Sequence, residues 1–267
     1  MSSPPALLTL TTDFGQTDHY VGQMKGAILR IAPNATIVDM THAIPPQNVR
    51  AASFLLADLH DAFGPGTVHL AVIDPGVGSS RRIIAIKAGG QFYIAPDNGL
   101  LTLVLERFPD ARIVEISINS RWSGKISATF HGRDIMAPAA ARLARDQRLD
   151  ELGDPLAGEA IRLTDLHPRQ IPGTPSRIEG TIVWADHFGN LITNIPATML
   201  KDANGESLTA RSGRNTTRGL RQYYSEVAGG EILMLVGSSG RLEIAANGGS
   251  AAASWGARIG ATVVVTE

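Results

Sequence analysis

The spacing of apolar residues changes near residue 165, and this change limits the folds open to the chain. Before it, short apolar, β-branched runs alternate with segments of helical spacing, as in an α/β domain built on a parallel sheet. After it, helical spacing nearly vanishes, and short strand-like runs are separated by Gly, Asn and Ser turns. We predict an α/β fold: an N-terminal α/β domain (1–164) with a largely parallel central sheet, a proline-containing linker (165–176) and a C-terminal all-β, barrel-like domain (177–267).

The expected elements follow from these patterns. In the first domain, strands are expected at 7–11, 36–40, 68–73, 82–87, 92–95 and 112–116. Helices are expected there at 20–31, 48–62, 99–106 and 135–144, with Asn48 as the N-cap of the second. In the second domain, strands are expected at 177–184, 191–195, 207–210, 231–236, 241–245 and 262–266.

Charge and composition exclude several functional classes. Lys and Arg number 24 against 25 Asp and Glu, so the net charge is -1 and no nucleic-acid partner is expected. Cysteine is absent, which excludes disulfides, zinc thiolates and cysteine nucleophiles. The N-terminal MSSPPA does not resemble a signal peptide, and no apolar window reaches the roughly 18 residues that span a bilayer. We therefore expect a cytoplasmic protein without membrane contact.

Two polar clusters follow strands of the first domain. Asp13 comes directly after the first strand, where its carboxylate can accept from both hydroxyls of a ribose or, alternatively, cap a turn. Asp74 and Arg81 stand at the two ends of the loop DPGVGSSR, whose glycines permit a tight turn. The turn can bring them together for chemistry or as a structural ion pair. The loop has no lysine and no G-K-[ST] ending, which disfavours a nucleoside triphosphate.

Two further turns belong to the same domain. APDNGLL (95–101) is expected to be structural, because Asp97 and Asn98 are good capping residues. Phe130 and His131 lie in TFHGRD (129–134) at a helix start, where the imidazole serves either a ligand or the structure. Neither an H-E-x-x-H nor an H-x₃-H pattern occurs there, so no metal site is expected.

The second domain opens on DHFGNL (186–191). Asp186, Phe188 and Asn190 offer a carboxylate, a ring and an amide that can bind an ammonium group, stack on adenine and hydrogen-bond a polar edge. The alternative is an ordinary β-turn. Ser238, in the hairpin turn GSSG (237–240), can hold a carboxylate or serve only the turn.

Taken together, these clusters resemble the S-adenosyl-L-methionine (SAM) hydroxide adenosyltransferases, which are related to fluorinating and chlorinating enzymes that use SAM. The resemblance rests on five ordered segments: TTDFGQTDHYVGQMKGAI (11–28), DPGVGSSRR (74–82), APDNGLL (95–101), TFHGRDIMAPAA (129–140) and DHFGNLITNI (186–195). It implies hydrolysis of SAM to adenosine and L-methionine, no cofactor besides the substrate, and a homotrimer with active sites between subunits.

The resemblance also assigns roles to residues. It implies that Asp74, Arg81 and His131 form a trio that binds the reacting water. It further implies that Asp13 binds the ribose and Asp186 the methionine amino group. The remaining implied substrate contacts are Phe188, Asn190, Ser238 and Phe130.

Two departures from the halogenating relatives favour water over halide as the nucleophile. Those enzymes keep an uncharged hydroxylated residue where this chain has Asp74, whose negative charge would repel a halide. They also carry an inserted loop before the strand 92–95, where this chain has only Ala-Gly-Gly-Gln after Lys87. A halide-using adenosyltransferase, a non-catalytic SAM or adenosine sensor and a metal-dependent hydrolase remain as alternatives.

Overall fold

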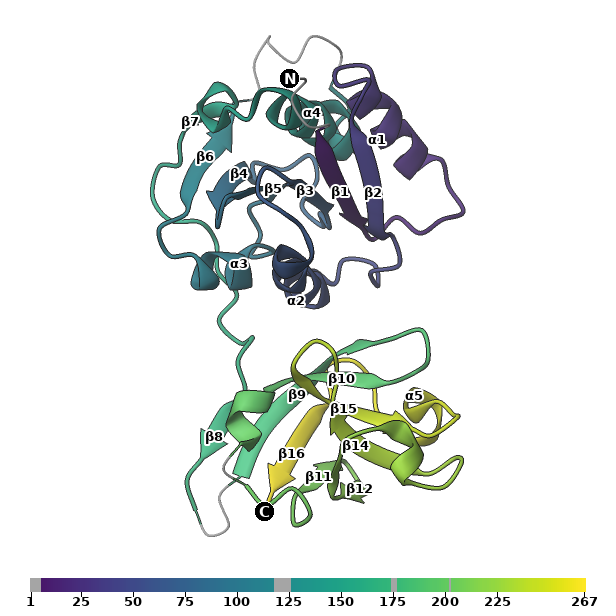
Figure 1. Ribbon diagram of the computed structural model, residues 1–267. Helices are drawn as coiled ribbons and strands as arrows, with labels where there is room; N and C mark the ends of the chain where they lie inside the picture. Colours follow the sequence, from purple (N-terminus) through teal and green to yellow (C-terminus); the bar gives the residue numbers. More distant parts are fainter. Residues whose placement is uncertain (1–5, 118–125, 174–176, 202) are drawn as a thin grey trace. The chain divides into compact units, whose positions relative to one another are not determined.

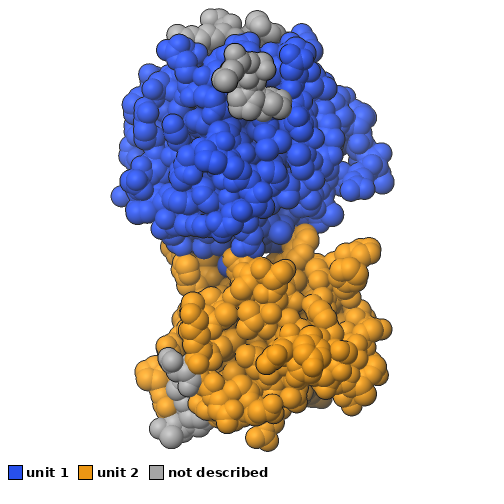
Figure 2. Space-filling view, in the orientation of Figure 1, with its two compact units in different colours: residues 1–163 blue, residues 164–267 orange. Residues whose placement is uncertain are grey.

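The computed structural model describes residues 6–117, 126–173, 177–201 and 203–267 (Figure 1). It divides into two compact units, Met1–Leu163 and Thr164–Glu267, which Figure 2 shows in different colours. Each unit has its own hydrophobic core. Within the described residues, no helix is long and apolar enough to cross a membrane.

The first unit is built on a seven-stranded sheet with the order β2-β1-β3-β5-β4-β6-β7. Its strands are β1 (Leu7–Thr12), β2 (Thr36–Thr41), β3 (Val68–Val72), β4 (Ile83–Ala88), β5 (Gln91–Pro96), β6 (Arg112–Ile116) and β7 (Gly153–Pro155). The first four strands of that order are mutually parallel, whereas β4 runs antiparallel to β5 and β6. The predicted α/β class with a mostly parallel sheet is confirmed.

Helices cover both faces of this sheet (Figure 1). Helices α1 (Tyr20–Leu29) and α4 (Ala137–Asp146) lie on one face, and α2 (Val49–Leu59) and α3 (Thr102–Arg107) on the other. Asn48 caps α2 as expected, accepting from the Ala51 amide at 3.0 Å, a contact worth about 1 kcal/mol. Helix α3 begins three residues later than predicted, because Gly99 has a φ of +91°, which an α-helix does not accept.

The predicted helix 135–144 has two parts. A π-helical turn, η3 (Gly132–Met136), precedes α4, whose second residue is Pro138. Proline has no N–H to donate to the carbonyl four residues earlier, so the regular α-helical bonding cannot run through this point. His131 stands immediately before the turn.

The loop 95–101 has the structural role that the sequence predicts. Asp97 is 2% exposed and accepts from Arg82 Nε and from the Ile161 amide, both at 2.8 Å. Asn98 accepts from the Leu100 amide at 3.2 Å. These contacts tie the loop to the end of the first unit.

The second unit is a barrel-like sheet with the order β12-β11-β16-β9-β10-β15-β14-β13, and β8 pairs with β9 outside this path. Its strands are β8 (Arg169–Ile171), β9 (Arg177–Ala185), β10 (Leu191–Pro196), β11 (Thr209–Ser212), β12 (Asn215–Arg218), β13 (Leu220–Arg221), β14 (Ile232–Val236), β15 (Arg241–Ala246) and β16 (Thr262–Thr266). Thr217 of β12 donates to the Ile232 carbonyl of β14 at 3.3 Å, so the two ends of the sheet approach each other. The predicted all-β, barrel-like class is confirmed.

The segment 165–176 differs from the expected linker. It contains β8, which pairs antiparallel with β9, while its residues 174–176 lie outside the described residues. The short strands β7, β12 and β13, and the one-turn helix α5 (Ala251–Ser254), were also not predicted. Two to four residues are too few to display a period, so pairing with neighbouring strands decides their structure.

Candidate active site

The carboxyl ends of β1 and β3 bring two of the predicted carboxylates to one edge of the sheet. These strands are parallel neighbours, and their register sets Thr12 opposite Val72. Asp13 follows the first strand directly, and Asp74 follows the second after one residue. Ligands of open α/β sheets collect at this edge.

Asp13 is half-buried, and its Oδ2 accepts from the Gln47 amide at 2.7 Å. The contact orients the carboxylate at the carboxyl end of β1. It is a long-range contact rather than a cap on its own turn, so it is compatible with either role considered for Asp13.

The loop after β3 folds back on itself and joins Asp74 to Arg81. The Val77 amide donates to the Asp74 carbonyl at 3.2 Å, and the Ser79 amide to the Gly76 carbonyl at 3.1 Å. Arg81 Nε lies 2.8 Å from Asp74 Oδ1 and 3.0 Å from Oδ2, and Nη2 also donates to Oδ2. The two side chains are 10% and 5% exposed, so the loop holds a buried ion pair.

His131 completes this group from a distant part of the chain. It is 8% exposed, and its Nδ1 lies 2.9 Å from Arg81 Nη2. Burial and the neighbouring Arg81 charge lower the pKa of His131, while the carboxylates Asp74 and Asp134 act in the opposite direction. The three residues predicted as a trio therefore lie in contact.

One buried polar atom of the trio has no partner among the described residues. Arg81 Nη1 is buried and makes no hydrogen bond to any described residue. Buried donors are nearly always satisfied, and an unsatisfied one costs about 1–3 kcal/mol or more when charged. A small acceptor held at this nitrogen, such as a water molecule, would satisfy it.

Gly78 fits the Asp74 loop against the segment that carries His131. Its φ is +80°, and a Cβ at this position would lie 2.3 Å from the Ala128 carbonyl oxygen. Any larger residue must therefore separate the two segments or strain the backbone. The distance between Arg81 and His131 depends on this close approach.

We expect Gly78→Ala to lower the free energy of unfolding by about 1–3 kcal/mol and to reduce turnover. Urea unfolding and steady-state kinetics would measure both effects. Gly26→Ala, in α1, is the matched control: a Cβ there meets no atom within 4 Å, and alanine favours the helix. Equal stability of Gly78→Ala and the unmodified protein would contradict the close approach.

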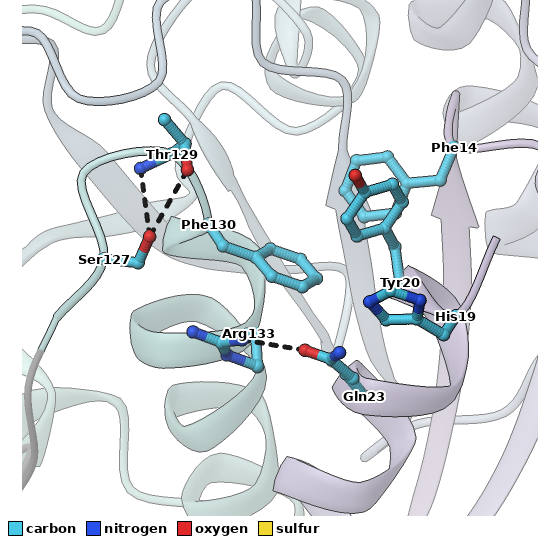
Figure 3. A pocket seen from close by; sticks show the side chains of 8 residues that line it. All are labelled: Phe14, His19, Tyr20, Gln23, Ser127, Thr129, Phe130 and Arg133. Atoms are coloured by element: carbon cyan, nitrogen blue, oxygen red, sulfur yellow. Dashed lines mark hydrogen bonds between the residues drawn. The ribbon is translucent and has the colours of Figure 1, made fainter.

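A pocket of about 330 Å³ lies in the first unit, lined in part by Phe130, the residue before His131 (Figure 3). Its lining comes from the loop after β1, the start of α1, the segment before η3 and η3 itself: Phe14, His19, Tyr20, Gln23, Ser127, Thr129, Phe130 and Arg133. Phe130, predicted as a substrate contact, therefore lines a pocket and precedes His131 directly. The segments TTDFGQTDHY and TFHGRD, which stand more than 100 residues apart, meet here.

Three aromatic rings define the apolar wall of this pocket. The centroids of Phe14, Tyr20 and Phe130 lie 5.3–5.9 Å apart in edge-to-face arrangements. Arg133 lies 4.8 Å from the centroid of Phe130 and donates to Gln23 Oε1 at 2.7 Å, as Figure 3 shows. A wall of aromatic rings of this kind can bind an apolar chain, or a cation whose charge is spread over several atoms.

In the second unit, the candidate residues 186–190 form the turn between β9 and β10. Asp186 accepts from the Asn190 amide through Oδ1 and from Asn190 Nδ2 through Oδ2, both at 2.8 Å. The bonding expected of an ordinary turn is thus present. Phe188 is 73% exposed at the tip of the turn, and its ring contacts only the neighbouring His187 ring among the described aromatic pairs, in an edge-to-face arrangement at 5.6 Å. Ser238 is exposed in the turn between β14 and β15.

Glu243 is a buried acid that interacts with Asp186 of the turn 186–190, and the sequence analysis did not single it out. It lies on β15, is 7% exposed, and interacts with the Tyr224 hydroxyl. Burial and the charge of Asp186 raise its pKa. A Cβ on Gly237 would overlap Glu243 Oε1, so the glycine makes room for the carboxyl group. A single acid inside the apolar run Leu242–Ala246 was the available signal.

The described residues contain no group of three His, Asp or Glu side chains placed to hold a metal ion. The chemistry that the first unit offers is that of a buried Asp–Arg–His group and of an aromatic pocket. It can hold a small polar molecule at Arg81 and a larger ligand in the pocket.

Comparison with known proteins gives the same two-part division. Residues 8–153 match the model of the SAM hydroxide adenosyltransferase N-terminal domain, and residues 180–264 match that of the C-terminal domain. A solved structure of an uncharacterized conserved protein from Thermotoga maritima superposes with a TM-score of 0.90 at 37% identity, covering 97% of this chain and 100% of that one.

Named relatives match over nearly the full length. The "(R)-S-adenosyl-L-methionine hydrolase" of Salinispora tropica is 36% identical, covering 99% of both chains. The protein of the same name from Thermus thermophilus is 36% identical over 94% of this chain and 96% of its own. A "Fluorinase" from an Actinoplanes species is 30% identical, covering 98% of this chain and 97% of that protein. With both domain models matched in order, the chain belongs to the SAM hydroxide adenosyltransferase family.

Proposed function

We propose that this protein hydrolyses SAM to adenosine and L-methionine by attack of water on C5′ of the ribose. The observation that carries the proposal is the buried contact of Asp74, Arg81 and His131, with Arg81 Nη1 left free to bind a water. The names of the full-length relatives support SAM as the substrate.

The chemistry demanded by SAM suits such a group. The sulfonium leaves as a neutral thioether, so departure of methionine needs no acid. The difficulty is the nucleophile, because the pKa of bulk water is about 15.7. Asp74 and His131 are the two groups of the trio that can orient the water, and the proton passes to one of them. Arg81 stabilises the developing hydroxide as a fixed cation in a site shielded from solvent.

The remaining candidates hold the substrate. Asp13, at the same sheet edge as Asp74, accepts from the ribose hydroxyls, and Phe130 lies against the substrate next to the reacting carbon. On the second unit, Asp186 binds the methionine ammonium and Ser238 its carboxylate, with Phe188 and Asn190 at the adenine or methionine. Fixing both ends aligns water, C5′ and sulfur for in-line displacement.

The contact between Asp74 and Arg81 changes the reason for preferring water to halide. Arg81 neutralises the Asp74 charge, so simple repulsion of a halide is weaker than the sequence implied. What Asp74 offers instead is a proton acceptor, which water requires and a halide does not. The preference for water therefore rests on proton transfer.

Incubation with SAM in ¹⁸O-water tests the reaction. We expect one ¹⁸O atom in the 5′-hydroxyl of adenosine and none in methionine, as measured by mass spectrometry. A chloride-dependent 5′-chloro-5′-deoxyadenosine product would identify a halide-using enzyme instead. Tight SAM binding without any product would identify a sensor.

We also propose that the enzyme works without a metal or organic cofactor, in the cytoplasm, as a homotrimer. Attack by water on a sulfonium ion needs neither redox chemistry nor a Lewis acid. The trimer rests on the family resemblance, and sedimentation equilibrium would measure it. Full activity in the presence of a strong chelator is the expected result for a metal-free enzyme.

A further inference from the structure

The hydrogen bonds of the trio define where the proton of His131 resides. Arginine carries only donors and keeps its charge at any physiological pH. Because Arg81 Nη2 lies 2.9 Å from His131 Nδ1, that ring nitrogen must be the acceptor. The single proton of the neutral imidazole is therefore on Nε2. The lowered pKa of His131 agrees with a neutral ring.

The same hydrogen bonds leave one nitrogen of the Arg81 guanidinium, Nη1, available for another partner. Nε and Nη2 are both committed to Asp74, and Nη2 also to His131. Nη1 is buried and has no partner in the described part of the chain. Asp74 holds the guanidinium from one side and His131 from another, so the plane of the group is fixed and Nη1 has a defined direction.

These contacts restrict proton transfer to His131. Its Nδ1 lone pair faces a cationic donor, and its Nε2 already bears a proton. Neither nitrogen can take a proton from water unless Arg81 first moves away. Asp74 is different, because each carboxylate oxygen can accept two hydrogen bonds and, among the described residues, Oδ1 accepts only from Arg81 Nε.

We propose that His131 is a positioning residue, which accepts from Arg81 and so aims Nη1 at the reacting water, and that Asp74 is the base. This deepens the proposed hydrolysis and rests on it. In the step, an O–H bond of water breaks and its proton passes to Asp74. The oxygen bonds C5′, and the C5′–S bond breaks with its electron pair remaining on sulfur.

Substitutions at His131 separate positioning from proton transfer. Asparagine places an amide oxygen near the position of Nδ1 and cannot titrate, whereas alanine removes the acceptor. We expect His131→Asn to keep kcat within about tenfold of the unmodified enzyme and His131→Ala to lose about 10²-fold or more. His60→Asn is the matched control. The Nδ1 of His60 also makes a hydrogen bond, at 2.8 Å, but its partner is the Tyr93 hydroxyl, which is not part of the trio.

Two kinetic outcomes would overturn the proposal. One is a folded His131→Asn that binds SAM but is as slow as His131→Ala. The other is a His131→Gln variant, whose amide reaches toward the Nε2 position, more active than His131→Asn.

Nitrogen-15 NMR of the imidazole gives a readout that needs no turnover. In histidine-labelled protein without substrate, we expect the pattern of the Nε2–H tautomer for the resonance that disappears in His131→Asn. An Nδ1–H or doubly protonated ring at neutral pH would refute the positioning role even if SAM is hydrolysed. Absence of adenosine formation by a protein with the expected tautomer would instead refute the proposed function.

Discussion

Replacing Asp74 with Asn is expected to lower kcat for adenosine formation by at least about 10²-fold, the usual size for removal of a general base. The amide keeps the shape of the side chain but cannot take the proton of the attacking water. SAM should still bind, because the ribose and methionine contacts are elsewhere. Product formation at saturating SAM, with calorimetric measurement of binding, checks both statements.

The same substitution also affects stability. Arg81 is 10% exposed and would lose its counter-ion, and breaking a buried pair by removing one partner costs about 3–5 kcal/mol. Asp61→Asn is the matched control, since the Asp61–Arg107 pair is 70% and 42% exposed and should contribute little. Should Asp74→Asn fail to fold, Asp74→Glu provides the second variant: it retains a base and should be more active than Asp74→Ala. Turnover near that of the unmodified enzyme in a folded Asp74→Asn would exclude Asp74 as the base.

Acidification is expected to destabilise the first unit through His69, even in the absence of substrate. His69 is fully buried on β3, and burial lowers its pKa from 6.5 to about 4. The unfolded chain binds this proton more readily than the folded one. Stability is therefore fully present above pH 6.5 and falls as the pH drops from there toward 4, by about 3 kcal/mol over the interval.

The hydrogen bonds around His69 fix its neutral form. Gln91 Nε2 donates to the His60 and Phe63 carbonyls, so Gln91 Oε1 must accept from His69 Nε2 at 2.7 Å. Thr9 then donates to Nδ1 at 2.8 Å. A second proton on the ring would leave a charge in the core with no counter-ion among these partners.

Urea unfolding between pH 7 and pH 4 measures this dependence. A His69→Gln variant should lose stability at pH 7 but show a flatter acid dependence, because glutamine cannot bind the proton. His187→Gln, at an exposed position, should leave the dependence unchanged. A His69→Gln variant with the full acid dependence would assign the effect to other groups.

The local patterns of the chain predicted most of the regular structure. Asn48 caps α2 as expected, and the class of each unit follows from its apolar spacing. Errors occur where a short element depends on a pairing strand or on a single residue rather than on an apolar period. The strand β8 exists because it pairs with β9, and the π-helical turn before α4 reflects the missing N–H of Pro138. Neither feature has a periodic signature.

The candidate site divides in the same way. The motifs named Asp74, Arg81 and His131, but spacing alone left an ion pair and a catalytic group equally acceptable. Arg81 and His131 are 50 positions apart, and only the fold brings Nη2 to Nδ1. Glu243 was missed because its importance comes from Asp186 and Tyr224, which lie on other segments.

By itself, the sequence determined the two fold classes and the family, because apolar period and motif order are properties of neighbouring residues. The tertiary structure alone decided which nitrogen of His131 accepts from Arg81, which nitrogen of Arg81 has no partner in the described part of the chain, and which rings face the pocket. These depend on hydrogen-bond direction and on packing between segments far apart in the chain. The trio is therefore named by its motifs, but the separate task of each member is set by the fold.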